Sequence, residues 1–156
     1  MLSTFRLAAS IAAIAVVAAA TQPASAAPAD DACALLTPTQ IGAVLSASVG
    51  AGTYLTPTFK KTCTWNATAG HEFVTLMLEN ADWFQSGKVP MVSSIVVTPA
   101  SGVGDDAYYL AVGQNVGLIV KKGNVSFKVA VYAANTPLSK KEALEKTLAQ
   151  QIVTRL

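Results

Sequence analysis

The sequence contains only two cysteines, Cys33 and Cys63, and their positions constrain the fold more than any other feature. Cys33 lies just ahead of a predicted helix. Cys63 lies in segment 61–65, where cysteine and tryptophan alternate with threonines as in a half-buried strand. Two cysteines in an exported chain usually form one disulfide. We therefore expect a Cys33–Cys63 bond that fastens a helix to a sheet.

Segment 36–41 carries a strong signal for the start of that helix. Thr37 is the predicted N-cap, Pro38 is the first helical residue, and the Gln40 side chain is placed to reach back to the N-cap amide. An apolar face then continues at spacings of three and four residues, formed by Ile41, Val44 and Leu45. The small residues of segment 46–52 are expected to end the helix.

The first 26 residues have the pattern of a cleaved signal peptide. Arg6 supplies a positive charge ahead of an apolar run at 7–20, and residues 24–26, Ala-Ser-Ala, form a typical cleavage site. The run has 14 residues, whereas a membrane-spanning helix needs roughly 20. We expect cleavage after Ala26 and a secreted or periplasmic, soluble domain of residues 27–156 with no membrane span. The residues before Cys33 lack a lipoprotein cleavage site, so lipid attachment is not expected.

The charge of the exported part does not indicate a nucleic-acid partner. Without Arg6, ten basic and nine acidic residues remain, and the basic residues are scattered along the chain. Nucleic-acid-binding domains usually carry a clear excess of positive charge gathered on one face. No nucleic-acid partner is therefore predicted. No cofactor is predicted either, because the sequence contains no metal-ligand cluster and no nucleotide-binding loop.

Strand patterns occupy most of the chain between its two ends. They lie at 53–59, 61–67, 72–80, 95–98, 108–112, 116–121 and 125–133, with a short helix at 80–87. Pro57 places the first of these strands at a sheet edge. A two-residue turn after Lys122 sets two apolar series on the same face of the sheet, namely Val116, Leu118 and Val120, and Val125, Phe127, Val129 and Val131.

Residues 138–156 predict a second long helix, opened by a capping box between Ser139 and Glu142. Its core-facing stripe is expected to consist of Leu144, Leu148, Ile152 and Leu156. Two ion pairs, Lys141–Glu145 and Glu142–Lys146, are expected on its exposed side. Helices at both ends with strands between them predict an α+β fold, in which a mostly antiparallel sheet of six or seven strands packs against the N- and C-terminal helices.

Residues 102–107, Gly-Val-Gly-Asp-Asp-Ala, match a dinucleotide-binding fingerprint only in spelling. The fingerprint needs a helix after the glycines to hold the pyrophosphate, and here a tyrosine-rich strand follows. We interpret Gly102 and Gly104 as allowing a close approach into the strand, and we expect Asp105 and Asp106 to cap turn amides.

No catalytic or metal-binding residues are assigned. Asp105 and Asp106 are adjacent and enter a strand, so their side chains point to opposite faces and cannot flank one bond. A calcium site would need further oxygen ligands. His71 is the only histidine and lies in a predicted turn without a serine-nucleophile motif. An enzyme in which Asp105, Asp106 and His71 converge in the fold remains an alternative.

Neighbouring aromatic residues must divide between the core and the surface, because adjacent side chains cannot all be buried. The candidate contacts to a ligand or partner are Trp83, Phe84, Asp105, Asp106 and Tyr108. The missing catalytic set favours a non-enzymatic binding or interaction module of the cell envelope. A secreted inhibitor of a partner protein is a further alternative.

Four short motifs occur in a fixed order along the exported part. They are Cys-Ala-Leu-Leu-Thr-Pro at 33–38, Cys-Thr-Trp at 63–65, Gly-Val-Gly-Asp-Asp-Ala-Tyr at 102–108 and Lys-Lys-Gly-Asn at 121–124. In this combination the chain resembles a group of small bacterial exported proteins and lipoproteins of unknown function. The resemblance implies the fold and an extracytoplasmic location, and it implies no activity.

Overall fold

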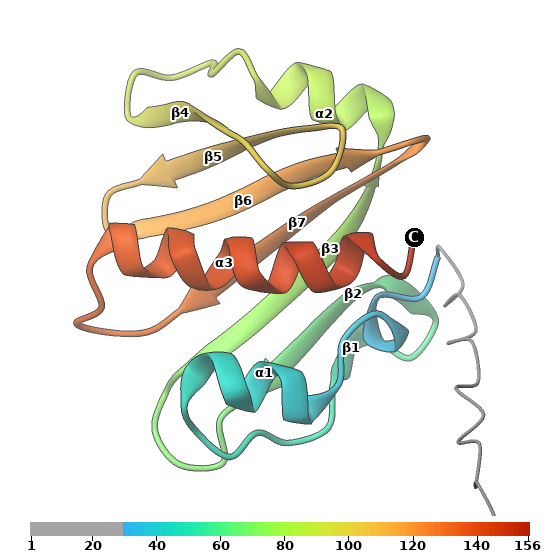
Figure 1. Ribbon diagram of the computed structural model, residues 1–156, viewed down its shortest axis with the longest axis vertical. Coiled ribbons are helices and arrows are strands. Elements are labelled where there is room, and N and C mark those ends of the chain that lie inside the picture. The colour runs from blue at the N-terminus through green and yellow to red at the C-terminus, as the bar shows by residue number, and fades with distance from the viewer. Residues whose placement is uncertain (1–29) are drawn as a thin grey trace, which may run out of the picture.

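The computed structural model describes residues 30–156, and the predicted signal peptide lies outside this range. These residues form an antiparallel sheet of seven strands with helices on both of its faces (Figure 1). The elements in chain order are η1 (Ala32–Ala34), α1 (Pro38–Leu45), β1 (Thr53–Thr56), β2 (Phe59–Asn66), β3 (Phe73–Asn80), α2 (Ala81–Gly87), β4 (Ile95–Ala100), β5 (Asp106–Val112), β6 (Asn115–Lys122), β7 (Val125–Tyr132) and α3 (Leu138–Val153). The predicted α+β fold is confirmed.

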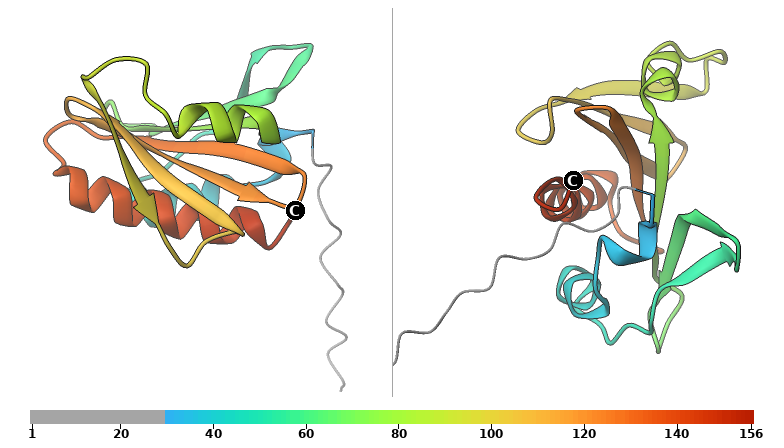
Figure 2. Two further views of the ribbon diagram at one scale, coloured as in Figure 1. Left: turned by 90° about the horizontal axis from the view of Figure 1, so that it is seen from above. Right: turned by 90° about the vertical axis from the view of Figure 1, so that its right-hand side faces the viewer.

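The order of strands in the sheet is β1-β2-β3-β7-β6-β5-β4. Two runs of neighbouring strands, β1 to β3 and β4 to β7, are joined by the pairing of β3 with β7. Helices α1 and α3 lie on one face of the sheet, and α2 lies on the other (Figure 2). No helix within residues 30–156 is long and apolar enough to cross a membrane.

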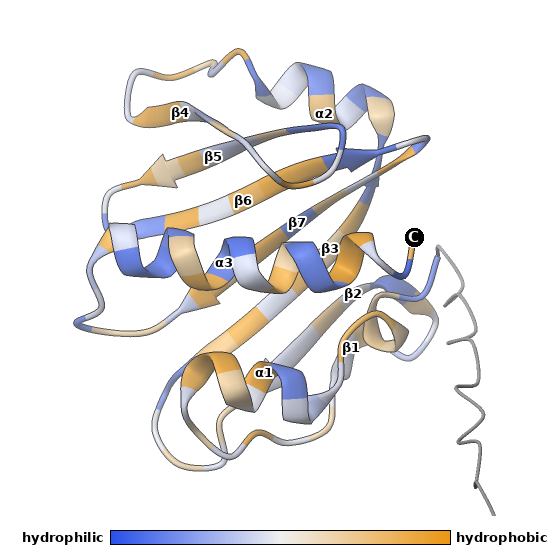
Figure 3. Ribbon diagram, viewed as in Figure 1, coloured by the Kyte–Doolittle hydropathy of each residue, from blue (hydrophilic) through white to orange (hydrophobic). Residues whose placement is uncertain are grey.

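The main core lies between the sheet and the pair α1 and α3. The predicted register is confirmed, because Leu118 pairs with Val129 and Val120 pairs with Phe127. These four side chains are buried and face α3. Figure 3 shows the apolar residues concentrated along β6 and β3, while α3 alternates between polar and apolar residues.

The strand boundaries differ from the prediction at both sheet edges. β1 is an edge strand, as Pro57 predicted, but it ends at Thr56 because the hairpin turn takes up Pro57 and Thr58. β4 forms the opposite edge and continues through Pro99 to Ala100. A proline is tolerated there because one side of an edge strand has no ladder partner for an N–H.

Helix α1 begins as predicted. The Gln40 amide donates to Thr37 Oγ1 over 3.3 Å, and the Thr37 amide donates to Gln40 Oε1 over 2.9 Å. This reciprocal pair satisfies two amides that a helix start otherwise leaves without acceptors.

Helix α3 begins where it was predicted, but its predicted cap is wrong. The helix begins at Leu138, after Pro137, and the expected capping box between Ser139 and Glu142 does not form. The Pro137 carbonyl instead accepts from the amides of Lys140 and Lys141, each over 3.1 Å. Proline has a fixed φ close to the helical value, so it can precede a helix without a side-chain cap.

The exposed side predicted for α3 is also wrong. Lys141 is only 5% exposed and Glu145 is fully buried, so both lie on the face that packs against the sheet. Leu148 and Ile152 are buried on that same face, as expected, whereas Leu144 and Leu156 are only half-buried at its margin. Neither predicted ion pair, Lys141–Glu145 or Glu142–Lys146, is among the salt bridges of residues 30–156.

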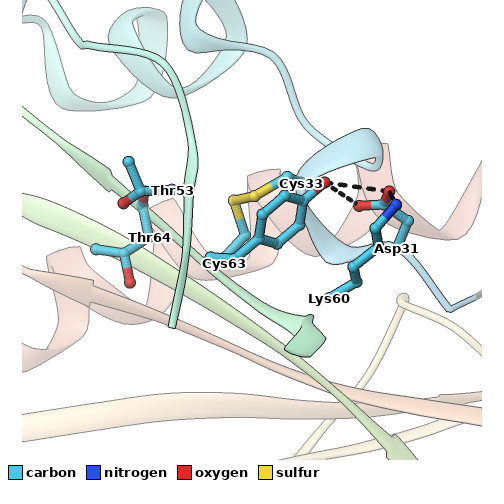
Figure 4. Close-up of a disulfide and its surroundings, with 7 residues drawn as sticks. Asp31, Cys33, Thr53, Lys60, Cys63 and Thr64 are labelled. Atoms are coloured by element: carbon cyan, nitrogen blue, oxygen red, sulfur yellow. Dashed lines mark hydrogen bonds and ion pairs between the residues drawn. A yellow bond between two sulfur atoms is a disulfide. The ribbon is translucent and has the colours of Figure 1, made fainter. Parts of the chain in front are cut away.

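The predicted disulfide between Cys33 and Cys63 is confirmed. It joins η1 to β2 with a Cα–Cα distance of 5.1 Å (Figure 4). Beside it the Tyr54 hydroxyl donates to Asp31 Oδ1 over 2.9 Å, and Lys60 Nζ lies 3.8 Å from the Asp31 carboxylate. The start of the described chain is therefore fastened to the β1–β2 hairpin by one covalent bond and by these polar contacts.

We predict that Cys33→Ser lowers the free energy of unfolding by about 3–4 kcal/mol, because the disulfide closes a loop with a sequence separation of 30. Cys33 is the better position to replace, since it is half-buried and Cys63 is fully buried. Urea unfolding followed by circular dichroism measures the change. Reduction of the wild-type protein should cause the same loss and should leave the variant unchanged. A variant as stable as the oxidised wild type would contradict the prediction.

Candidate functional site

The predicted aromatic contacts divide between core and surface. Trp83 is 63% exposed, whereas Phe84 is fully buried in a second, smaller core beneath α2. Tyr108 belongs to the same core, and its hydroxyl donates to the Phe84 carbonyl over 3.1 Å. Burial raises the pKa of the Tyr108 phenol to about 12. Phe84 is therefore a structural residue, and Trp83 alone of these three presents a large apolar surface to solvent.

Asp105 has the predicted role at a turn. Its carboxylate accepts from the Gly123 amide over 2.7 Å and from Lys122 Nζ over 2.9 Å. The hydrogen bond from the Gly123 amide and, to a smaller extent, the bond from Lys122 lower the pKa of Asp105. Gly104 allows the close approach that this requires: its φ is +60°, and a Cβ there would lie 2.5 Å from the Lys121 carbonyl oxygen.

Asp106 does not cap a turn amide, and the prediction is wrong in this respect. Its carboxylate pairs with Lys88, which follows α2. The side chain points away from Asp105 because the two residues are adjacent at the start of a strand. Lys88, Asp106 and Tyr108 border a cavity of about 400 Å³.

The structure does not bring His71 together with the two aspartates. Asp106 lies in the same cross-strand row as Glu79, near the end of β3, whereas His71 precedes Phe73 at the start of β3. The six positions from Phe73 to Glu79 correspond to about 20 Å along a strand. That distance is far beyond hydrogen-bond reach, so the geometry gives no support to an enzyme built on these three residues.

A cavity of about 460 Å³ lies at the end of the sheet where His71 is found. It is bounded by the start of β3, the start of β6, the end of β7 and the first turn of α3. Its lining includes His71, Phe73, Asn115, Tyr132, Asn135 and Lys141. We call this space the β6–β7 cavity.

The β6–β7 cavity lies where two neighbouring strands stop pairing. β6 begins at Asn115 and β7 continues to Tyr132, but their pairing ends at Leu118 and Val129. Beyond that point the Val131 amide donates to Glu145 Oε1 over 3.0 Å. A side chain of α3 therefore supplies the acceptor that a strand partner would otherwise provide.

The Glu145 carboxyl is fully buried, and its second oxygen, Oε2, has no hydrogen-bond partner within the described residues. Burial raises the pKa of Glu145 to about 8, and the bond from the Val131 amide opposes this shift. Of the nearby charges, Glu142 raises the pKa further, while Lys128 and Lys141 lower it. The carboxyl is mainly protonated at neutral pH.

Lys141 is the buried charged side chain that lines the β6–β7 cavity. Its Nζ donates to the Gln114 carbonyl over 2.8 Å, and no carboxylate lies within 4.0 Å of it among residues 30–156. An ammonium group has three donors. The one hydrogen bond that it makes leaves donor capacity for a further acceptor.

A flat aromatic wall forms another side of the β6–β7 cavity. Phe73 and Tyr132 are cross-strand neighbours, and their rings stack with centroids 4.3 Å apart and an interplanar angle of 11°. Both residues are half-buried. Asn115, Asn135 and His71 are exposed at the rim. Asn135 adopts a φ of 59°, a left-handed conformation that asparagine tolerates and that turns the chain after β7.

Trp83 borders a separate apolar groove of about 310 Å³ on the face of the sheet that carries α2. Phe59 and Met77 line the same groove, and Phe59 is 44% exposed. This groove and the β6–β7 cavity lie at opposite ends of β3, because Trp83 follows the end of that strand.

The β6–β7 cavity was not predicted from the sequence, because Lys141 and Glu145 were expected on the exposed side of α3. A signal was present, since Lys141, Glu145, Leu148 and Ile152 also recur at spacings of three and four residues. Within residues 30–156 no three His, Cys, Asp or Glu side chains gather in a manner suited to a metal ion.

Comparison of the chain with protein-family models, with curated proteins and with solved structures finds no match in any of the three. The resemblance to small exported bacterial proteins therefore stays a prediction.

We predict that Glu145→Gln removes a pH dependence of stability. The folded-state pKa of Glu145, about 8, lies above the ordinary value of 4.5, so the folded state holds this proton more tightly than the unfolded state. The stabilisation is complete below about pH 4.5 and is lost as the pH rises to about 8. Between about pH 4.5 and pH 8 the contribution of Glu145 to the free energy of unfolding falls by an amount on the order of 4 kcal/mol, since each pKa unit corresponds to about 1.4 kcal/mol.

Chemical denaturation between pH 5 and pH 8.5 measures this slope. Glu72→Gln is the matched control, because Glu72 is only half-buried and its charge is not among those that shift the pKa of Glu145. The control variant should keep the slope of the wild type. An unchanged slope in Glu145→Gln would show that the buried carboxyl does not set the pH dependence.

Proposed function

We propose that this protein is a non-enzymatic binding domain of the cell envelope, and that the β6–β7 cavity is its ligand site. The observation that carries the proposal is Lys141, which is 5% exposed and lines the cavity, and whose Nζ hydrogen-bonds to a neutral carbonyl group and to no carboxylate of residues 30–156. Buried charges are usually paired, because removing a charge from water is costly. A buried lysine that has no carboxylate partner and lines an open cavity is best explained by a ligand whose negatively charged group pairs with the ammonium.

The size and composition of the cavity also support ligand binding. A volume of about 460 Å³ falls within the range of small-molecule sites, which combine apolar walls with a few placed polar groups. Here Phe73 and Tyr132 supply the apolar wall, and Lys141 with the amides of Asn115 and Asn135 supplies the polar groups. His71 lines the rim, but the cavity lining contains no aspartate or glutamate to orient this histidine and no serine or cysteine to act as a nucleophile. This lining favours binding over nucleophilic catalysis.

Export is proposed on two grounds. Residues 1–26 have the sequence pattern of a signal peptide. The Cys33–Cys63 disulfide is of a kind that persists in oxidising compartments. A secreted or periplasmic location would expose the β6–β7 cavity to small molecules of the envelope.

A second candidate function, inhibition of a partner protein, is favoured by the groove beside Trp83. An indole that is 63% exposed next to Phe59 and Met77 has the character of an interface anchor. Capture of a partner from envelope extract by the wild type, and its loss in Trp83→Ala, would favour this function. Capture that survives Trp83→Ala would count against it.

We predict that small molecules found to raise the melting temperature of the purified protein act through the β6–β7 cavity. Ala134 lines the cavity and is exposed, so Ala134→Trp should fill its mouth and abolish the shifts. Ala43→Trp, on the exposed side of α1, is the matched control and should retain them. A thermal-shift screen of envelope glycan fragments, lipids, peptides and small organic acids provides the measurement.

Two outcomes would contradict the proposal. One is a set of shifts that Ala134→Trp leaves unchanged, because binding would then occur elsewhere. The other is turnover of a screened compound, detected by mass spectrometry after incubation, because the protein would then be an enzyme.

A further inference from the structure

We infer that the ligand of the β6–β7 cavity is a small organic carboxylate with a flat apolar part, an inference that rests on the proposed function. The cavity presents one buried ammonium group on one side and a stacked aromatic pair on another. The ammonium group selects for the carboxylate of the ligand, and the aromatic pair selects for its flat apolar part.

The charge on the cavity wall selects for a single negative charge. Lys141 is the only lysine that lines the cavity, and no arginine, aspartate or glutamate lines it. The nearest turn of α3 does not supply a counterion, because Glu145 uses Oε1 to accept from the Val131 amide and forms no salt bridge with Lys141. One ammonium neutralises one carboxylate and forms charge-assisted hydrogen bonds with it.

A phosphate or sulfate ester fits these observations less well. Both groups carry more oxygens than a carboxylate, and a phosphate monoester also carries up to two charges. Proteins usually hold such groups with several cations, arginine forks or a row of backbone amides. The lining of the β6–β7 cavity contains a single lysine and no arginine. A carboxylate therefore matches the number of charged donors present.

The aromatic wall selects for a flat apolar group. The rings of Phe73 and Tyr132 are nearly parallel, with an interplanar angle of 11°, and neither residue is fully buried. Aromatic rings favour offset-stacked or edge-to-face contact with a further ring. The exposed amides of Asn115 and Asn135 lie at the rim and can bond polar substituents.

Isothermal titration calorimetry with the oxidised, purified protein tests the inference. The probes are phenylacetate and N-acetylphenylalanine, each compared with its uncharged amide and with inorganic sulfate. The acids should bind at least about tenfold more tightly than the amides, because a hydrogen bond to a charged group is typically worth one to two factors of ten. This comparison uses the unmodified protein and does not depend on the folding of any variant.

Lys141→Met should remove the preference for the acid over the amide while retaining the apolar stem of the side chain. Lys140→Met is the matched control, because Lys140 is the neighbouring residue and is exposed. Its replacement changes the net charge by the same amount. The control should keep the full preference for the acid. Preference retained in Lys141→Met would overturn the inference.

The remaining outcomes separate the inference from the proposed function. Equal binding of acid and amide, both blocked by Ala134→Trp, would overturn the carboxylate inference and leave the binding site in place. Sulfate binding as tight as that of the acids would overturn it in the same way. Failure of every carboxylate, with compounds of another class bound in the cavity, would also defeat the inference alone. Absence of binding by every class would defeat both.

Discussion

The pairing of β3 with β7 is the constraint on which the rest of the structure depends. The two strands pair over eight residues, from Phe73 with Tyr132 to Asn80 with Val125, and they join two runs of strands that are otherwise separate in the sequence. Because β4 lies at the far edge of the sheet, the chain must cross one face after β3, and α2 covers that face on the way. The same pairing brings the start of β3 beside the end of β7, and there the aromatic wall of the β6–β7 cavity forms.

Helix α3 determines where β6 and β7 separate. The Glu145 carboxyl accepts from the Val131 amide, so the ladder between the two strands ends without leaving that amide unpaired. A buried carboxyl with one free oxygen lowers stability unless its proton is retained. One turn earlier Lys141 reaches the Gln114 carbonyl just before β6. Two polar side chains of one helix thus hold the ends of two strands apart, and the cavity follows from that separation.

Features that depend on neighbouring residues or on a fixed period could be predicted from the sequence, whereas those set by distant partners could not. The cap of α1 and the register of β6 against β7 belong to the first kind. The burial of Lys141 and Glu145 belongs to the second, because the apolar residues Leu144 and Leu156 suggested a different face of α3. Glu145 is buried because its carboxyl accepts a hydrogen bond from the Val131 amide of β7, and this partner is not visible in the sequence of α3. Asp106 was misassigned for the same reason, since its partner Lys88 lies beyond α2.

The two ends of α3 differ in the way that they are held. At the C-terminal end, Leu148, Ala149 and Ile152 are fully buried, and Arg155 donates to the Ala34 carbonyl over 3.2 Å, next to the disulfide-bonded Cys33. Towards the N-terminal end, the buried side chains of α3 are those of Lys141 and Glu145, and the burial of charged groups opposes folding. A ligand that neutralises Lys141 would stabilise the less stable end of the helix and would raise the stability of the whole domain by mass action. Covalent and apolar stabilisation thus lies at one end of the sheet, and the β6–β7 cavity lies at the other.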